Sequence, residues 1–176
     1  MSHVLPYKGI LPRIEPGVFV APSASVVGDV TIGASSSIWY GTVVRGDVMP
    51  IRIGARTSIQ DNAVVHATGG WAETVVGDEV TVGHSVILHG CRIGHRVLVG
   101  MGTIVLDDAE IGEGTMVGAG SLVMARARIP AGVLAHGRPC KAVRDLRPDE
   151  LEKVLEAARL YVQYGREHAE SIAAAR

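Results

Sequence analysis

The sequence predicts an all-β fold, a single-stranded parallel β-helix, followed by one α-helix. Small aliphatic residues, often followed by glycine, recur at six-residue steps over most of the 176 residues, and such hexad repeats are typical of a parallel β-helix. Apolar residues make up 47% of the chain but aromatic residues only 4%, which favours a core of stacked Val, Ile and Leu side chains. Helical spacing of apolar residues appears only near the C-terminus.

Residues 1–17 contain three prolines and are expected to form an extended N-terminal segment. Residues 18–140 are expected to form the β-helix, with each repeat aliphatic pointing inward and stacked on its counterpart in the next coil. Recurrent glycine at the turns is expected to permit positive φ. The repeat aliphatics are Val27, Ile32, Ile38, Val44, Ile53, Ile59, Val65, Val76, Val82, Leu88, Ile93, Val99, Val105, Ile111, Val117, Val123 and Ile129.

The period breaks at four steps, and the two long breaks predict loops at corners of the coil. The longer steps lead from Val44 to Ile53 and from Val65 to Val76, and two shorter ones start at Val27 and Leu88. After Ile129 the hexads fade. Residues 141–176 are therefore expected to form an exit turn and a C-terminal helix over about 148–170, which opens with a proline and two acids.

Composition and charge exclude several classes of partner. The formal net charge is -1, which favours neither nucleic acid nor an anionic membrane as a partner. No apolar stretch has the length of a membrane span or the pattern of a signal peptide. Cys91 and Cys140 follow no metal or redox spacing. They are expected to be buried, inert thiols, and the location to be cytoplasmic.

Three histidines, His66, His84 and His89, fall in register positions that suit a shared site. Counted from the repeat aliphatics, His66 and His89 occupy the same slot on the third side of the coil, one coil apart, and should stack at about 4.8 Å. His84 falls on the second side. Three neutral imidazoles suit a metal ion with an open position. A threefold ring would bring the third side of one chain to the second side of the next, which predicts a homotrimer with the site between chains.

The same columns contain a second set of polar residues one coil earlier. Arg45 lies in the column of His66, and Asp61 lies in the column of His84. The interface that joins the histidines should therefore bring Arg45 near Asp61 of the neighbouring chain. The two side chains could form a bidentate ion pair there. Asp47 could share that pair.

Three further residues in or near these columns could line a site for a small substrate. Gln60 is adjacent to the column of His84 and could hydrogen-bond a metal-bound water or the substrate. Met101 and Leu106 continue the two columns beyond the histidines. They are expected to form an apolar wall.

The sequences RGD at 45–47, QDN at 60–62 and GHSVILHGC at 83–91 resemble those of the gamma-class carbonic anhydrases and their relatives. The match covers nearly the whole chain, including GRPCKAV at 137–143 and the C-terminal helix. The resemblance implies a left-handed β-helix and a homotrimer with Zn²⁺, or Fe²⁺ or Co²⁺, at each of three interfaces. It implies a lyase that reversibly hydrates CO2 to bicarbonate by a metal-bound hydroxide.

The resemblance also implies roles for individual residues. His66, His84 and His89 would be the metal ligands, and Gln60 would lie near the metal-bound solvent. Arg45, Asp47 and Asp61 match the family's interface residues. Tyr161 matches a tyrosine that reaches the site in bacterial members, and Glu73 would carry the proton out. Val48 follows RGD here, where the archetypal enzyme has an acidic residue that shuttles protons.

Three alternatives stay open at the level of sequence. A hexapeptide-repeat acyltransferase shares the β-helix and the trimer but needs no metal. A metal-dependent acyl-CoA thioesterase would use the same three histidines. A non-catalytic metal-binding scaffold would use the trimer alone.

Overall fold

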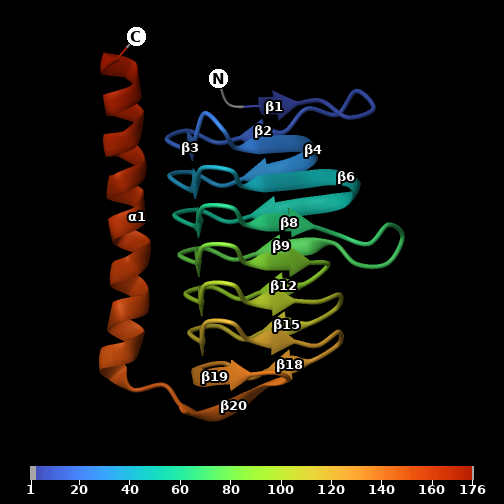
Figure 1. The fold of residues 1–176 in the computed structure, drawn as a ribbon, viewed down its shortest axis with the longest axis vertical. Helices are drawn as coiled ribbons and strands as arrows, with labels where there is room; N and C mark the ends of the chain where they lie inside the picture. The colour runs from blue at the N-terminus through green and yellow to red at the C-terminus, as the bar shows by residue number, and fades with distance from the viewer. Residues whose placement is uncertain (1–2, 176) are drawn as a thin grey trace.

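The computed structural model describes residues 3–175, and the chain winds as a three-sided solenoid of parallel strands with one long helix beside it (Figure 1). The predicted left-handed parallel β-helix with a C-terminal α-helix is confirmed. The first face contains β2 (Arg13–Ile14), β9 (Thr74–Val76), β12 (Arg92–Ile93), β15 (Glu110–Ile111) and β18 (Arg128–Ile129). The second contains β3 (Phe19–Val20), β5 (Ser37–Ile38), β7 (Ser58–Ile59), β10 (Thr81–Val82), β13 (Leu98–Val99), β16 (Met116–Val117) and β19 (Val133–Gly137).

The third face contains β1 (His3–Leu5), β8 (Val64–His66), β11 (Ile87–His89), β14 (Ile104–Val105) and β17 (Leu122–Val123). Two longer strands, β4 (Ser25–Ile32) and β6 (Val43–Ile53), pass around the corner between the third and first faces. The chain leaves the coil through β20 (Cys140–Asp145), antiparallel to β19, and ends in α1 (Pro148–Ala174).

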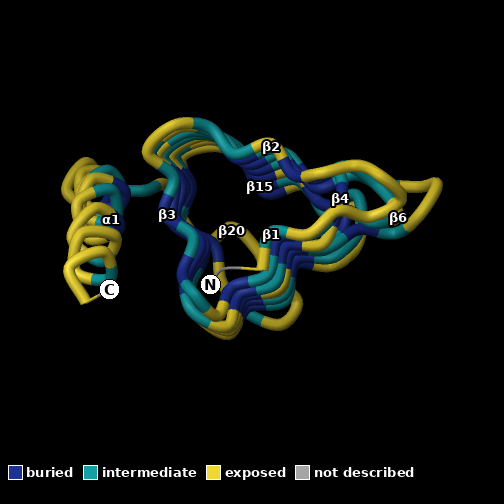
Figure 2. Tube along the Cα trace, turned by 90° about the horizontal axis from the view of Figure 1, so that it is seen from above, coloured by how far each residue is buried: buried dark blue, intermediate teal, exposed yellow. Residues whose placement is uncertain are grey.

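The core is a set of stacked aliphatic columns, one for each face, and it lies inside the coil. Figure 2 shows the buried residues, in dark blue, recurring at the same places in successive coils. On the second face Ile38, Ile59, Val82 and Val99 follow one another in register and are fully buried. On the third face Val65 pairs with Leu88, which in turn pairs with Val105. Burying each such side chain stabilises the fold by about 1.5–3 kcal/mol. The hexad spacing produces this core because every coil adds one residue to each column.

One repeat residue differs from the prediction. Val26, not Val27, points into the core: Val26 is fully buried and pairs with Val44. The step from Val26 to Ile32 is then a regular hexad. The prediction was wrong because Val27, like many repeat aliphatics, is followed by a glycine. The alternation of inward and outward side chains along β4 instead buries Val26 and leaves Val27 half-buried.

The glycines that follow the repeat aliphatics on the first face serve close packing of the coils. A Cβ atom on any of these glycines would lie under 3.0 Å from backbone atoms of the next coil. These glycines are Gly33, Gly54, Gly77, Gly94 and Gly112. Their φ angles are not positive, so the expected reason was wrong at these positions. Positive φ occurs further into the corners, at residues such as Ser35, Arg56 and Glu79.

The N-terminal segment takes part in the coil. Within residues 3–17, β1 and β2 both pair in parallel with β4. The first coil therefore begins ahead of residue 18, inside the segment for which an extended conformation is expected from the sequence.

Helix α1 covers the second face, as the view from above shows (Figure 2). Val154, Ala158 and Gly165 are its buried apolar contacts, and a Cβ on Gly165 would lie 3.2 Å from Phe19 Cβ. Tyr161 packs edge-on against Trp39 with ring centroids 5.4 Å apart. The helix extends to Ala174, beyond the expected end near residue 170.

An ion-pair cluster fixes the start of α1. Arg144 donates two hydrogen bonds to the Glu150 carboxylate, at 2.7 and 2.8 Å, and the Arg147 backbone N–H donates a third at 3.0 Å. Together, with the bonds from Arg144 as the main cause, they lower the pKa of Glu150 to about 2. The same carboxyl titrates near pH 4.3 in an unfolded chain.

We expect this cluster to stabilise the protein above about pH 4.3 and to lose its effect as the pH falls toward 2, because the folded state then binds the proton less readily than the unfolded state. Glu150→Gln should lower the Tm at pH 7 by several degrees, and the gap to wild type should close near pH 2. Thermal melts of both metal-free proteins across this pH range measure it. Glu152→Gln, an exposed carboxyl on the same helix, is the control; an equal loss there would contradict the prediction.

Both cysteines are free and buried, as expected. Burial raises the pKa of Cys91 to about 12, so its thiol stays protonated near neutral pH. Within residues 3–175, no helix combines the length and apolar character needed to cross a membrane.

Candidate metal centre

Two of the three histidines meet on the third face. His66 ends β8 and His89 ends β11, and the two residues pair directly across the parallel ladder. Nδ1 of His66 lies 3.2 Å from Nε2 of His89. The predicted stacking of these two residues, one coil apart, is confirmed.

The third histidine lies on another side of the coil. His84 follows β10 at the corner between the second and third faces, and 43% of its side chain is exposed. Its Nδ1 lies 2.8 Å from Oδ2 of Asp61. Within residues 3–175 of one chain, no group of three or more His, Cys, Asp or Glu side chains is arranged to hold a metal ion.

Each histidine has a carboxylate partner. His66 Nε2 lies 3.0 Å from Asp47 Oδ1, and His89 Nδ1 lies 3.0 Å from Asp107 Oδ1; Asp61 completes the set at His84. Metal-binding histidines commonly use one ring nitrogen for the metal and give the other to a carboxylate, which fixes the ring and its tautomer.

The donor set fits a zinc ion. Two nitrogens bound tetrahedrally to Zn²⁺ at about 2.0–2.1 Å would be about 3.3 Å apart, and the facing nitrogens of His66 and His89 are 3.2 Å apart. Zinc bound by three imidazoles keeps one open position. Within residues 3–175 of one chain, His84 does not join His66 and His89 in such a group.

Arg45 and Asp47 lie beside His66. Arg45 forms an ion pair with Asp47 within the chain, and Arg45 is 44% exposed while Asp47 is 16% exposed. Burial opposes ionisation of Asp47, but the hydrogen bond with His66 and the pairing with Arg45 outweigh it and lower the pKa of Asp47. The predicted pairing of Arg45 with Asp61 of a neighbouring chain stays a prediction.

Gln60 and Tyr161 lie on the side of His84. Gln60 is 5% exposed and directly precedes Asp61. Burial, with a smaller effect of the Asp61 charge, raises the pKa of Tyr161, so its phenol stays neutral. The structure thus divides the expected site residues into two groups, one around His66 and His89 and one around His84.

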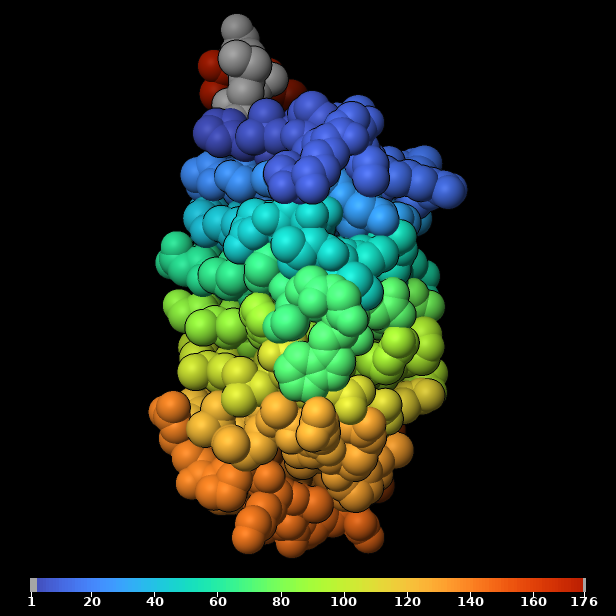
Figure 3. Space-filling model, turned by 90° about the vertical axis from the view of Figure 1, so that its right-hand side faces the viewer, coloured from blue at the N-terminus to red at the C-terminus, as the bar shows by residue number. Residues whose placement is uncertain are grey.

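Glu73 belongs to neither group. It lies in the loop after β8 and forms an ion pair with Arg92, 2.7 Å away. The same loop carries Trp71, whose ring lies under the Arg126 guanidinium at 5.4 Å. Figure 3 shows this loop, in green, folded over the coils that follow it.

Sequence reasoning missed Asp107. Asp107 comes two residues after Val105, which pairs with Leu88, so it lies over Gly90 in the next coil. The sequence signal for this contact was the glycine directly after His89 together with an acidic residue at the same position of the next coil.

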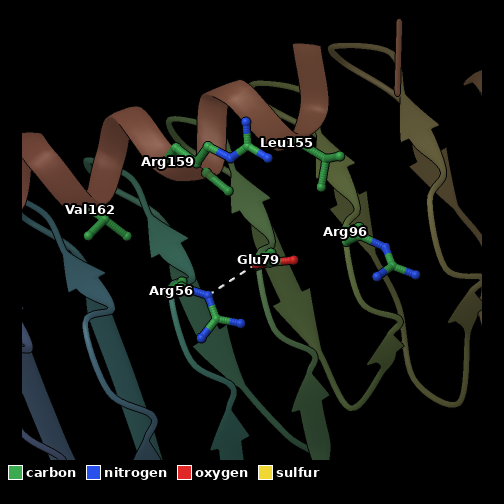
Figure 4. Close-up of a pocket in the computed structure, with 7 residues that line it drawn as sticks. Arg56, Glu79, Arg96, Leu155, Arg159 and Val162 are labelled. Atoms are coloured by element: carbon green, nitrogen blue, oxygen red, sulfur yellow. Dashed lines mark hydrogen bonds and ion pairs between the residues drawn. The ribbon is translucent and has the colours of Figure 1, made fainter. Parts of the chain in front are cut away.

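A groove lies away from the histidines, between α1 and the corner that joins the first and second faces (Figure 4). Its volume is about 340 Å³, and it is lined by Arg56, Glu79, Arg96, Leu155, Ala158, Arg159 and Val162. Arg56 is paired with Glu79 at 3.1 Å, and the arginine side chains point in different directions (Figure 4). This groove contains none of the expected site residues.

The third face has an uncovered apolar stripe. The outward positions one residue before the core column are occupied along this face by Val43, Val64, Ile87, Ile104 and Leu122. Val64 and Ile87 are each 37% exposed. By contrast, α1 covers the second face, and the corresponding positions on the first face include Arg52, Arg92, Glu110 and Arg128.

Similar proteins share the repeat and nearly the whole length of the chain. A family model described as bacterial transferase hexapeptide, with six repeats, matches residues 90–125. Gamma carbonic anhydrase 2, mitochondrial, of Arabidopsis thaliana is 46% identical over 90% of this chain. A carbonic anhydrase of Geobacillus kaustophilus is 48% identical over 92% of this chain and 88% of its own length.

The chain belongs to the gamma-class carbonic anhydrase-like family. The chain described here spans 59% of the length of the Arabidopsis relative. The family fold is also found in the crystal structure of a hexapeptide transferase family protein from Anaplasma phagocytophilum. That structure is 44% identical with a TM-score of 0.90, and the match covers 94% of this chain and 97% of the other.

Proposed function

We propose that this gamma-class carbonic anhydrase-like chain forms a homotrimer that reversibly hydrates CO2 to bicarbonate with zinc at each of its three interfaces. One observation carries the proposal: three histidines, each bound to its own carboxylate, are split between two sides of one chain. The apolar stripe on the third face gives the second chain a surface to pack on. Head-to-tail contacts of this kind close into a ring under threefold rotation.

His66 and His89 of one chain, with His84 of the next, would hold the metal. Zinc in such a site supplies Lewis-acid activation that lowers the pKa of water to about 7. Asp47, Asp61 and Asp107 keep one nitrogen of each ring free by accepting a hydrogen bond from the other. The chain thus presents preorganised ligands before the metal binds.

The surrounding side chains would position CO2 and align the chains. Gln60 would orient the nucleophile or polarise CO2 through its amide. Met101, 60% exposed next to the His84 corner, and Leu106 beyond His89 would provide the apolar wall. Arg45 would pair with Asp61 of the neighbouring chain and hold the two faces in register.

Proton export would be the weak step. Val48, 46% exposed, stands where the archetypal enzyme has an acid, and Glu73 is held by Arg92. Glu73 would then carry protons only when that ion pair opens. Tyr161, with a neutral phenol, would serve as a hydrogen-bonding group rather than a base. The cytoplasmic location stays a prediction from the sequence.

A stopped-flow assay of CO2 hydration on trimer of verified zinc content tests the proposed function. We expect zinc-dependent hydration whose turnover rises with buffer concentration, because buffer replaces the missing proton carriers. Hydrolysis and transfer of an acyl-CoA, measured alongside, test the thioesterase and acyltransferase alternatives, and the likeness to the Anaplasma hexapeptide transferase family protein favours the second of these. A zinc-loaded trimer inert toward CO2 would contradict the proposal.

A further inference from the structure

We propose that Asp107 is the positioning residue that fixes His89 for metal binding, and that residue 90 is glycine so that the Asp107 carboxylate can reach the ring. This inference rests on the proposed metal site. It concerns how one ligand is prepared, and its test does not depend on which reaction the site performs.

The carboxylate sets the tautomer of His89. Asp107 Oδ1 lies 3.0 Å from His89 Nδ1, and an ionised carboxylate only accepts hydrogen bonds, so Nδ1 must carry the proton. The lone pair of a neutral ring then remains on Nε2, the atom that faces His66 Nδ1 at 3.2 Å. The contact therefore directs the ligand nitrogen of His89 toward the second histidine.

Gly90 makes space for this contact. Its φ angle is +57°, and a Cβ atom there would collide with Asp107 Oδ1 and lie 3.1 Å from Ala72 Cβ. The Gly90 N–H donates to His66 O at 3.1 Å, and the Gly90 carbonyl accepts from Asp108 N at 2.6 Å. Gly90 is thus held in place by backbone bonds to the coils on both sides, and a larger residue would have to displace the Asp107 side chain.

The surroundings of Asp107 keep its carboxylate in contact with His89. Only 16% of the Asp107 side chain is exposed, and within residues 3–175 the only basic group within 4.0 Å of its carboxylate is His89. The Asp107 carbonyl accepts a hydrogen bond from Arg126 N at 2.9 Å. The Arg126 guanidinium in turn lies over the ring of Trp71, in the loop after β8. Limited access of water strengthens a hydrogen bond of this kind.

Asp108 provides a matched control. It is the adjacent residue with the same side chain, but its carboxylate is 43% exposed and faces Arg128 at 3.5 Å instead of a histidine. Any general effect of removing one negative charge at this corner should therefore appear equally in Asp107→Asn and Asp108→Asn.

The test measures the zinc affinity of intact trimers by competition with a chelator. We expect Asp107→Asn to weaken zinc binding about 10- to 100-fold, whereas Asp108→Asn should stay within about twofold of wild type. The visible absorption spectrum of the Co²⁺-loaded trimer should change in Asp107→Asn alone, because it reports the ligand field and not folding. Sedimentation of each metal-free variant checks that the trimer is intact.

Zinc binding by Asp107→Asn within about twofold of wild type, or an equal loss in Asp108→Asn, would overturn the inference. Wild-type trimer that binds no zinc would overturn the proposed function together with it. Zinc affinity that falls as expected in a trimer inert toward CO2 would support the role of Asp107 and contradict only the proposed reaction.

Gly90→Ala tests the second part. This variant should weaken zinc binding in the wild-type chain by displacing the carboxylate, but it should add little to the loss already caused by Asp107→Asn. Two changes that act through one contact are non-additive. Fully additive losses would show that Gly90 acts independently of Asp107 and would overturn this part.

Discussion

His84→Ala should remove zinc from the protein while leaving the trimer assembled. The variant deletes one of three proposed ligands, and the apparent binding free energy of protein zinc sites, about 10–16 kcal/mol for four ligands, gives each ligand a share of roughly 3 kcal/mol. We expect the zinc affinity to fall at least a hundredfold. Metal analysis of the purified trimer, with CO2 hydration measured alongside, checks the result.

His95→Ala is the control for this variant. His95 also has a carboxylate neighbour, Asp78, at 3.6 Å, but it lies at the corner between the first and second faces, outside the two columns. It should keep full zinc content. Unchanged zinc stoichiometry in His84→Ala would remove His84 from the ligand set and with it the reason to place the site between chains.

Ile87→Asp should produce a monomer that binds zinc poorly. Ile87 lies at the middle of the apolar stripe on the third face, one strand position from the core residue Leu88. In the proposed trimer the new carboxylate would be buried without a partner at each of three interfaces, at a cost of several kcal/mol per chain. His66 and His89 remain in such a monomer, but His84 of a neighbour does not reach them.

Val75→Asp is the matched control, because Val75 occupies the same strand position on the first face. There the new carboxylate lies between Arg52 and Arg92 in the neighbouring strands, so we expect a stable trimer with normal zinc affinity. Sedimentation velocity and a chelator competition on both variants make the comparison. A monomeric Ile87→Asp protein that binds zinc as tightly as wild type would show that one chain suffices for the site.

The sequence predicts the coil well because a hexad repeat leaves little choice. Each coil must place an aliphatic side chain on each face, so the register of His66 with His89 follows from counting alone. The separation of His84 from both follows in the same way. The counting went wrong only where alternation within a long strand competes with the repeat, at Val26 and Val27.

The remaining features depend on side-chain directions that counting does not give. The pairing of Asp107 with His89 crosses a corner, where a glycine in a left-handed conformation replaces the regular strand. The ion pair of Glu73 with Arg92 connects an inserted loop to the first face, and the repeat does not fix where such a loop folds. The recurrence of glycine on the first face is visible in the sequence, but glycine is required there by the short distance between coils and not by a positive φ.

The reversal of direction at β20 has a consequence for how the molecule behaves in a crowded solution. Every strand of the second face up to β19 runs parallel, so the last of them would offer an open edge on which another molecule could add strands without limit. β20 occupies that edge in the opposite direction, and its exposed residues include Lys141 and Arg144. A charged strand that runs antiparallel to the others is a poor template for fibre growth, so β20 protects the solenoid against end-to-end polymerisation on the second face.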